Sequence, residues 1–419
     1  MTTLKLLFAI AAGSVVFALA ATSLTYGTRQ SKPVASAPEN TTAPGNVAAP
    51  FPSPAPGPAA TPGAPAREAR VRVAPREIKA IYLTSWSAAT PSRLRGAMNL
   101  IQTTDLNGVV IDVKDYTGKV TFVTSSPLIK SIGSEQSRLG DLTLLVERLH
   151  QAGIYVIVRI AVFQDQHLIK VRPGLAVKDA RGNVWRDRKG LGWVDPAAQE
   201  AWAYVVEIAR EAVNAGVDEL NFDYIRFPTD GNLSGLRYPF FDEAGESRRR
   251  VIQRFFAYLN MELRPTGRQL SADLFGLATV TNDDLGIGQV LEDAFPYFDF
   301  ISPMVYPSHY ARGFLRHKNP AAHPYEVVRY SLERAVLRRA RFARSVAALA
   351  EAGVSGEDPR APDGWARIRP WLQAFDLGAP YPAEIIRKQF QAVQDAGLTH
   401  GWYLWSPSNS YQPASFVRQ

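Results

Sequence analysis

One acidic residue stands inside a segment that otherwise has the pattern of a buried strand. Residues 219–228 read ELNFDYIRFP, an apolar, β-prone run that ends at a proline. Because side chains alternate between the two faces of a strand, Asn221 and Asp223 share one face with Glu219 and Ile225. An ionisable side chain on the inner face of a core strand is unfavourable unless it is paired or used in chemistry. We therefore take Asp223 as the centre of a candidate active site.

Other polar residues interrupt strand-like segments elsewhere in the chain, and in each segment they fall mostly on one parity. Asp112 and Asp273 are further acids of this kind, and Arg159 is a cation. Asp115 has the opposite parity to Asp112 and is expected in a loop. Together the inward-facing side chains would line one pocket of carboxylates, cations and aromatic rings. Counted in steps of two, this set comprises Thr84, Trp86, Asp112, Lys114, Tyr116, Arg159, Asn221, Asp223, Ser271, Asp273, Ser302, Met304, Tyr306, Arg369, Trp371, Gln373, Tyr403 and Trp405.

Two carboxylates on neighbouring strands supply the groups that hydrolysis of a glycosidic bond requires. One carboxyl group protonates the leaving oxygen, and the other stays ionised as a nucleophile or as a base for water. Asp223 and Asp273 are expected to form this pair, with Asp112 as a third candidate. Arg159 would keep one aspartate ionised by direct pairing. The structural alternative is that Asp223 only forms a salt bridge with Arg159 or Lys114.

Aromatic and polar side chains around these acids are candidates for contacts with sugar rings. Trp86 and Trp405 are interpreted either as such platforms or as caps of the barrel. Trp185 either contacts substrate or packs the loop of residues 164–194, in which Trp193 is expected to pack. The candidate substrate-binding residues are Trp86, Lys114, Tyr116, Arg159, Trp185, Asn221, Tyr224, Tyr306, Gln373 and Trp405.

The elements that must position these residues alternate between strands and helices. Eight such alternations in about 340 residues predict an α/β fold, a (β/α)8 TIM barrel whose site lies at the C-terminal strand ends. A doubly wound sheet is the alternative, but the turn after Trp86 reads SAATP and lacks a glycine-rich phosphate loop. The expected strands are 78–86, 108–116, 155–163, 219–227, 269–277, 298–306, 368–375 and 401–405. The expected helices are 92–104, 142–152, 197–215, 248–263, 287–294, 325–352 (as one helix or as two) and 382–396.

The first part of the chain has the pattern of a targeting segment. Lys5 precedes an apolar run over residues 6–24, which predicts a signal peptide or an N-terminal membrane anchor within residues 1–28. Residues 29–76 are rich in proline and alanine and predict a disordered linker, so the barrel domain is expected over residues 77–419. The protein is therefore expected to be exported to the periplasm or cell envelope, with possible tethering to the inner membrane.

The composition excludes several classes of chemistry. The chain has no cysteine, so disulfides, zinc–thiolate sites and cysteine nucleophiles are excluded. Its few histidines show no metal-binding spacing, and we expect no cofactor and no metal. No nucleic-acid-binding module is recognisable. The formal charge of +8 indicates solvated helix faces or attraction to an acidic polymer or a membrane surface.

Five long motifs occur in order along the chain: VKDARGNVWRDRKGLGWVDP, ELNFDYIRFP, FISPMVYPSHY, IRPWLQAF and GWYLWSPSNSY. With these motifs the chain resembles a bacterial glycosyl hydrolase domain family that was long catalogued as a domain of unknown function. The resemblance covers roughly residues 78–411, and it implies a TIM barrel and a carbohydrate substrate without an established reaction. By looser similarity, α-amylase-like barrels place a nucleophile where Asp223 stands and an acid/base where Asp273 stands, although the latter is usually glutamate. Chitinase-like barrels carry a glutamate at the end of strand four that is missing here.

Three functions compete on these grounds. The first is a glycoside hydrolase that cleaves a cell-envelope or extracellular polysaccharide or oligosaccharide. The second is a non-catalytic glycan-binding or scaffold protein on a degenerate barrel, with which the long linker and the basic segment Arg334–Arg344 are compatible. The third is a metal-dependent polysaccharide deacetylase, against which the lack of clustered histidines argues.

Overall fold

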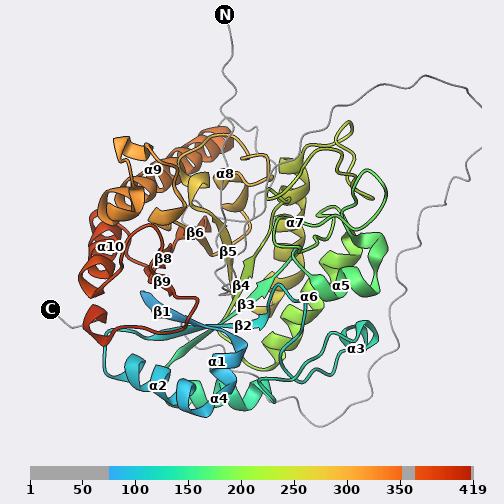
Figure 1. Cartoon of the computed structure of the whole chain (residues 1–419). Coiled ribbons are helices and arrows are strands. Elements are labelled where there is room, and N and C mark those ends of the chain that lie inside the picture. The colour runs from blue at the N-terminus through green and yellow to red at the C-terminus, as the bar shows by residue number, and fades with distance from the viewer. Residues whose placement is uncertain (1–74, 352–363, 417–419) are drawn as a thin grey trace, which may run out of the picture. The chain divides into compact units, whose positions relative to one another are not determined.

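The computed structural model describes residues 75–351 and 364–416, and these form a closed barrel of parallel strands (Figure 1). The predicted leader or anchor and nearly all of the predicted linker lie outside the described residues. The predicted (β/α)8 barrel is confirmed. Its strands are β1 (Ile78–Leu83), β2 (Gly108–Lys114), β3 (Tyr155–Ala161), β4 (Glu219–Asp223), β5 (Gln269–Phe275), β6 (Phe300–Met304), β7 (Arg367–Ile368), β8 (Trp371–Gln373) and β9 (Gly401–Trp405).

Nine strand segments fill eight positions around the barrel. Strands β1 to β6 pair in chain order, and β9 pairs with β1, so the blue and red ends of the sheet lie side by side (Figure 1). β7 and β8 together form the seventh position, because β7 pairs with β6 while β8 joins β6 to β9. The interruption falls at Arg369 and Pro370, and Pro370 has no backbone N–H to donate to the sheet.

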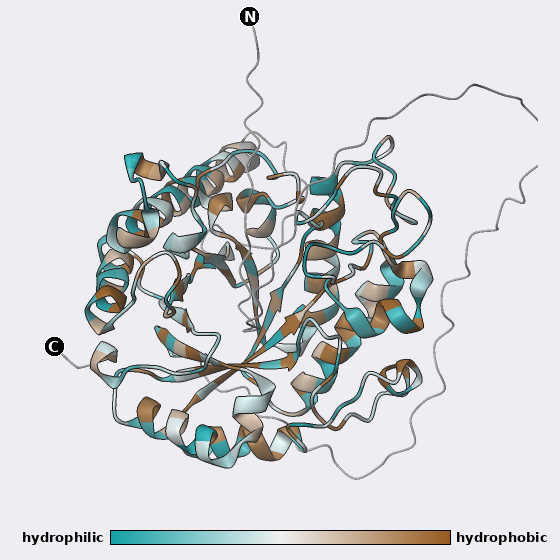
Figure 2. Cartoon of the chain, in the orientation of Figure 1, coloured by the Kyte–Doolittle hydropathy of each residue, from teal (hydrophilic) through white to brown (hydrophobic). Residues whose placement is uncertain are grey.

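Helices surround the barrel and bury their apolar faces against it, as the brown inner and teal outer surfaces in Figure 2 show. The helical region expected in one or two pieces is one continuous helix over Pro324–Glu351 in the described residues. Among the described residues, no helix combines the length and apolar character needed to cross a membrane. The helices are α1 (Ser85–Ala89), α2 (Pro91–Gln102), α3 (Pro127–Ile132), α4 (Leu142–Gln151), α5 (Gln166–Val171), α6 (Gln199–Asn214), α7 (Arg248–Leu263), α8 (Leu291–Ala294), α9 (Pro324–Glu351) and α10 (Ala383–Asp395).

The barrel interior is partly polar from its base upward. Glu219, at the start of β4, is fully buried and forms an ion pair with Arg369 at 2.7 Å. Tyr403 donates a hydrogen bond to the same carboxylate, and Arg369 stacks on Phe300 at 3.4 Å from the ring centroid. Burial lowers the pKa of Arg369, but Glu219, Tyr403 and Tyr155 together outweigh burial, so the pKa lies above its ordinary value. Glu219 is thus neutralised below the site, although it shares the parity of Asp223.

Candidate active site

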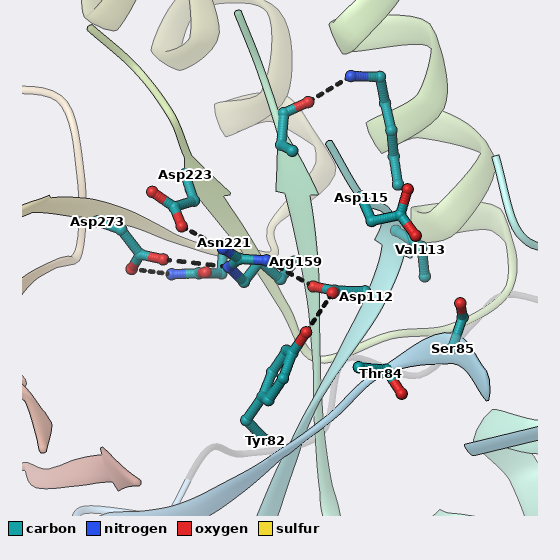
Figure 3. A network of polar contacts seen from close by, with 12 residues as sticks. Tyr82, Thr84, Ser85, Asp112, Val113, Asp115, Arg159, Asn221, Asp223 and Asp273 are labelled. Carbon is teal, nitrogen blue, oxygen red and sulfur yellow. Dashed lines mark hydrogen bonds and ion pairs between the residues drawn. The ribbon is translucent and has the colours of Figure 1, made fainter. Parts of the chain in front are cut away.

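The guanidinium of Arg159 is the centre of a carboxylate cluster at the C-terminal ends of β2, β4 and β5 (Figure 3). Its Nη1 lies 2.7 Å from Oδ1 of Asp112, and its Nη2 pairs with Oδ2 of Asp223. Its Nε lies 3.7 Å from Oδ2 of Asp273. Parallel pairing explains this convergence, because Arg159 stands beside Asp112 on one side and Asn221 on the other.

Asp223 is the last residue of β4 and is 5% exposed. Its Oδ1 accepts a hydrogen bond from the backbone N–H of Tyr224 at 2.5 Å, and its Oδ2 accepts from Arg159. Tyr224 has a left-handed φ of +56°, a conformation that costs on the order of 1 kcal/mol for a residue with a side chain. This turn leaves the Tyr224 ring 5.9 Å from the Arg159 guanidinium. Both oxygens of Asp223 are therefore engaged by hydrogen-bond donors.

Asp273 lies deeper, at 1% exposure, and is held differently. Its Oδ1 accepts hydrogen bonds from Nε1 of Trp371 at 2.7 Å and from Nδ2 of Asn221 at 2.8 Å. Its Oδ2 is buried without a hydrogen bond. Burial first, and then the negative charge of Asp223, raise the pKa of Asp273 well above the ordinary value, although Arg159 opposes the shift. A proton on Oδ2 fits this environment.

Asp112 forms the third side of the cluster together with Tyr82. The Tyr82 hydroxyl donates to Oδ2 of Asp112 at 2.5 Å (Figure 3). Burial raises the pKa of Asp112, and Arg159 opposes that shift. Tyr82 was not singled out in the sequence, although it lies on β1 and has the parity of Thr84 and Trp86 in the expected strand 78–86. The signal was its position two residues before Thr84. Asp115 lies apart from the cluster, as expected, and pairs with Arg138 at 3.4 Å.

An aromatic wall borders the cluster beside β6, β8 and β9. Tyr306 and Trp405 stack with centroids 5.4 Å apart, and Phe375 meets Trp405 edge-on at 4.8 Å. His309 joins this wall at 5.3 Å from Tyr306. Burial, and secondarily the charge of Lys189, lowers the pKa of His309 to about 4, so this ring is neutral near pH 7. A half-exposed Trp405 ring is suited to stack on a sugar.

Gln373 lies under this wall and its side-chain contacts are internal. Its Oε1 accepts from Oγ of Ser308 at 2.9 Å, and its Nε2 donates to the backbone oxygen of Phe375 at 2.9 Å. Gln373 is fully buried and also hydrogen-bonds through its backbone to the side chain of Gln389. The structure therefore places Gln373 as a support for the wall, while its predicted contact with substrate stays a prediction.

Lys114 lies outside the cluster, against the expectation from parity. The β2–β3 register shifts between Asp112 and Lys114, which turns the lysine toward the side of β2 that faces the helices. Its ammonium pairs with Asp165 at 2.9 Å and is fully buried. Nor can Lys114 be the salt-bridge partner of Asp223 in this arrangement. A register shift of this kind cannot be read from alternation alone.

Three predicted contact residues also lie away from the carboxylates. β1 ends at Leu83, so Trp86 belongs to α1 rather than to the strand, where it is 63% exposed beneath the guanidinium of Arg138 at 4.7 Å. Tyr116 follows β2 and is 38% exposed. Trp185 is buried and donates from Nε1 to the backbone oxygen of Asn232 at 2.8 Å, so it packs its loop onto the loop after β4.

Metal ligands are not gathered here. Within residues 75–351 and 364–416, no three histidine, aspartate or glutamate side chains are arranged to share a metal ion. The three aspartates instead face one guanidinium, which already supplies positive charge to them. The arrangement can hold one carboxyl protonated beside one that is ionised, which is the requirement for acid–base or nucleophilic chemistry at an acetal.

An eight-stranded parallel barrel with its reactive side chains at the C-terminal strand ends defines the TIM-barrel class of enzymes. The family described as "Putative glycosyl hydrolase domain" matches residues 80–411, and the chain belongs to this family. The resemblance drawn from the motifs is thereby confirmed. No protein of the curated set matches the chain.

Several solved structures are similar to the chain. A hypothetical protein from Ruminiclostridium thermocellum is 35% identical, with 49% of this chain and 98% of that chain covered and a TM-score of 0.43. The PgaB (BpsB) glycoside hydrolase domain from Bordetella bronchiseptica is 16% identical, with 82% and 99% covered and a TM-score of 0.48. An alpha-L-fucosidase from Paenibacillus thiaminolyticus is 14% identical, with 81% and 48% covered and a TM-score of 0.49. With TM-scores below 0.5, none of these adds to the family assignment.

Proposed function

We propose that the protein is a glycoside hydrolase in which Asp273 is the general acid and Asp223 is the ionised carboxylate. The observation that carries this proposal is the unequal environment of two aspartates that face one guanidinium. Asp223 contacts Arg159 directly and accepts a backbone hydrogen bond. Asp273 stands 3.7 Å from that guanidinium and has a raised pKa. Two carboxyl groups whose environments separate their protonation states are the pair that glycosidic cleavage uses.

The proposed reaction follows from these protonation states. Asp273 transfers its proton to the glycosidic oxygen as the bond from that oxygen to the anomeric carbon breaks. Asp223 either attacks the anomeric carbon or removes a proton from the water that attacks it. Arg159 pairs with Asp223, and Asp112 with Tyr82 holds the guanidinium in place. In the first route the sugar is left as an ester of Asp223, and water activated by Asp273 then displaces Asp223, so that two displacements retain the configuration. In the second route a single displacement by water inverts it, and nuclear magnetic resonance of the first anomer released separates the two.

The proposed substrate is a polysaccharide or oligosaccharide of the cell envelope or the extracellular space. The apolar run of residues 6–24 and the proline-rich residues 29–76 support export and a tether to the inner membrane. Trp405, half-exposed beside the cluster, and Trp86, exposed beyond β1, are the proposed sugar platforms. Aromatic faces of this kind stack on sugar rings while their edges remain in contact with water.

A non-catalytic glycan-binding protein is the second candidate. The observation that favours it is the enclosure of the three carboxylates, each of which is at most 5% exposed. In that case the cluster would only neutralise Arg159 inside the barrel. Burial of an ion pair is itself no sign of catalysis, because such pairs also serve as structural elements.

The test is release of new reducing ends. The purified full chain is incubated with a panel of neutral, amino and acidic polysaccharides, and reducing ends are counted over many hours. The proposal predicts release from at least one glycan by the wild type and none by Asp223→Asn. A glycan that binds the wild type tightly without any release of reducing ends would establish the second candidate instead.

A further inference from the structure

A second guanidinium lies next to the carboxylate cluster and has no acidic partner among the described residues. Arg226 follows Asp223 by three residues, at the exit of β4. Its side chain is packed between Trp193 and Phe275, with the guanidinium carbon 4.5 Å and 4.7 Å from the two ring centroids. The residue is only 4% exposed. The two rings therefore fix the plane of the guanidinium before any ligand arrives.

The polar contacts of Arg226 use one nitrogen. Nη1 donates to the backbone oxygen of Phe227 and to Oγ1 of Thr229, each at 3.2 Å. Nε and Nη2 make no hydrogen bond to the described residues, and neither is among the fully enclosed polar atoms that lack a partner. The edge formed by Nε and Nη2 is the edge with which arginine grips a carboxylate through two parallel hydrogen bonds.

The acids nearest to Arg226 are engaged elsewhere. Asp187 accepts from the backbone N–H groups of Lys189 and Leu191 and from Nε1 of Trp193. Asp230 pairs with Arg188 at 3.5 Å. No carboxylate in the described part of the chain lies within ion-pair distance of Arg226.

The consequence is a cation whose burial is poorly compensated. Burial lowers the pKa of Arg226 to about 10, and the charges of Tyr224, Asp223 and more distant acids only partly offset it. The other two arginines of the barrel mouth and interior, Arg159 and Arg369, have carboxylates in contact and raised pKa values, with burial opposing the rise. A desolvated guanidinium gains most from a ligand that brings the missing negative charge.

Arg226 is also close enough to the cluster to touch a substrate bound there. The Tyr224 ring lies 5.9 Å from the guanidinium carbon of Arg226 and 5.9 Å from that of Arg159. The Tyr224 ring thus lies near both the guanidinium of Arg226 and the guanidinium that holds Asp223. The net charge of +8 agrees with a polyanionic substrate.

We infer that Arg226 binds the carboxylate of a uronic acid residue, so that the glycan recognised at this site is acidic. The sugar that carries the carboxylate is adjacent to the glycosidic bond that is cleaved between the carboxyl groups of Asp223 and Asp273. This inference rests on the proposed hydrolysis at that pair, because it names the substrate class of the same site. Arg226 is a specificity-determining residue, and it does not take part in the transfer of the proton.

Matched oligosaccharides that differ only in charge test the inference. The probes are tetramers of galacturonate, glucuronate-containing and mannuronate chains, each compared with its carboxyl methyl ester, and a sulfated neutral tetramer. Binding to the full chain is measured by titration calorimetry, with the melting temperature of every variant recorded. The wild type should bind at least one uronate about tenfold more tightly than its ester. Arg226→Met should remove that preference, and Arg226→Lys should weaken it because an ammonium cannot form the paired hydrogen bonds.

The control is Arg329→Met, which deletes an exposed arginine paired with Glu333 on α9 and should leave the preference intact. The inference is overturned if the wild type prefers no uronate over its ester, or if it prefers only the sulfated probe. It is also overturned if Arg226→Met still prefers the uronate over its ester. If Arg226→Met does not fold, an undiminished preference in Arg226→Lys overturns the inference instead. Reducing ends are counted in a separate assay. If the wild type prefers a uronate over its ester but never releases reducing ends, the proposed hydrolysis is contradicted and the role of Arg226 in binding is not.

Discussion

The Nε atom of Arg159 stands 3.7 Å from Oδ2 of Asp273, whereas the same guanidinium contacts Asp223 directly. In the proposed mechanism this asymmetry assigns the two roles. Asp223, which contacts the cation, is the proposed carboxylate, and Asp273 is the proposed acid. Asp273 accepts two hydrogen bonds on Oδ1 and none on Oδ2, where a proton can reside.

Asp273→Asn should separate the acid role from the rest of the reaction. The amide cannot protonate a leaving group, so hydrolysis of the natural glycan should fall about 10²- to 10⁴-fold. A dinitrophenyl glycoside of the same sugar needs no such proton, because its leaving group is already a weak base. We expect the variant to retain most of its rate on that compound. Equal losses on both substrates would contradict the acid role.

The same proton gives a pH dependence of stability. Burial and the charge of Asp223 raise the pKa of Asp273 in the folded state above its value in the unfolded chain. The unfolded chain therefore releases this proton first, and the stability that Asp273 contributes is present below its unfolded pKa and lost as pH rises through its folded pKa. Asp273→Asn stays neutral throughout. Its melting temperature relative to the wild type should rise between pH 4 and pH 9, and a flat difference would contradict the shift.

Lys114 should affect stability more than recognition. Lys114→Met leaves Asp165 buried without its cation, so the free energy of unfolding should fall by about 3 kcal/mol in denaturant titrations. Lys79→Met is the matched control, since Lys79 pairs with Glu77 at 3.5 Å near the surface and should cost less than about 1 kcal/mol. If Lys114→Met kept full stability but lost affinity for glycans, Lys114 would contact substrate after all.

Trp86 should affect binding more than stability. The ring is largely exposed and already stacks with Arg138, so it can serve as a platform for a distant sugar unit. Trp86→Ala should raise KM for long oligosaccharides about tenfold, with kcat and the melting temperature nearly unchanged. Tyr330→Ala removes another exposed aromatic ring, on α9, and should change neither constant. A fall in kcat alone would place Trp86 among the groups that act in the transition state.

Alternation along the strands was sufficient to predict the core of the site. Asp112, Arg159 and Asp223 come together because each faces inward on its strand. Asp112 and Arg159 are register partners, and Asp223 stands two residues beyond Asn221, the partner of Arg159 on β4. The same reasoning failed at Lys114, where a register shift reverses the face, and at Trp86, where the side chain of Thr84 accepts from Ser87 and starts a helix earlier than expected. Both failures have a local backbone cause, a register shift in one case and an early helix start in the other. Neither changes the pattern of apolar and polar residues from which the strands were predicted.

Long-range pairing was beyond the reach of the sequence. Glu219 has the same parity as Asp223, and nothing local distinguishes the two acids. They differ because Arg369 and Tyr403, which follow more than 140 residues later, neutralise Glu219 at the base of the barrel. Likewise, the free edge of Arg226 became visible only once its aromatic neighbours and the partners of Asp187 and Asp230 were known.

The central claim is that Asp223 is a catalytic carboxylate and not only a partner for Arg159. The most direct measurement is the turnover of Asp223→Asn on a glycan that the wild type cleaves, together with its melting temperature. Asp293→Asn is the control, because Asp293 is also buried and paired with an arginine, at 2.6 Å from Arg249, on the outer helices. We predict a loss of more than about 1000-fold for Asp223→Asn with a melting temperature near that of the wild type, and full activity for Asp293→Asn. Undiminished turnover in a folded Asp223→Asn sample would contradict the account.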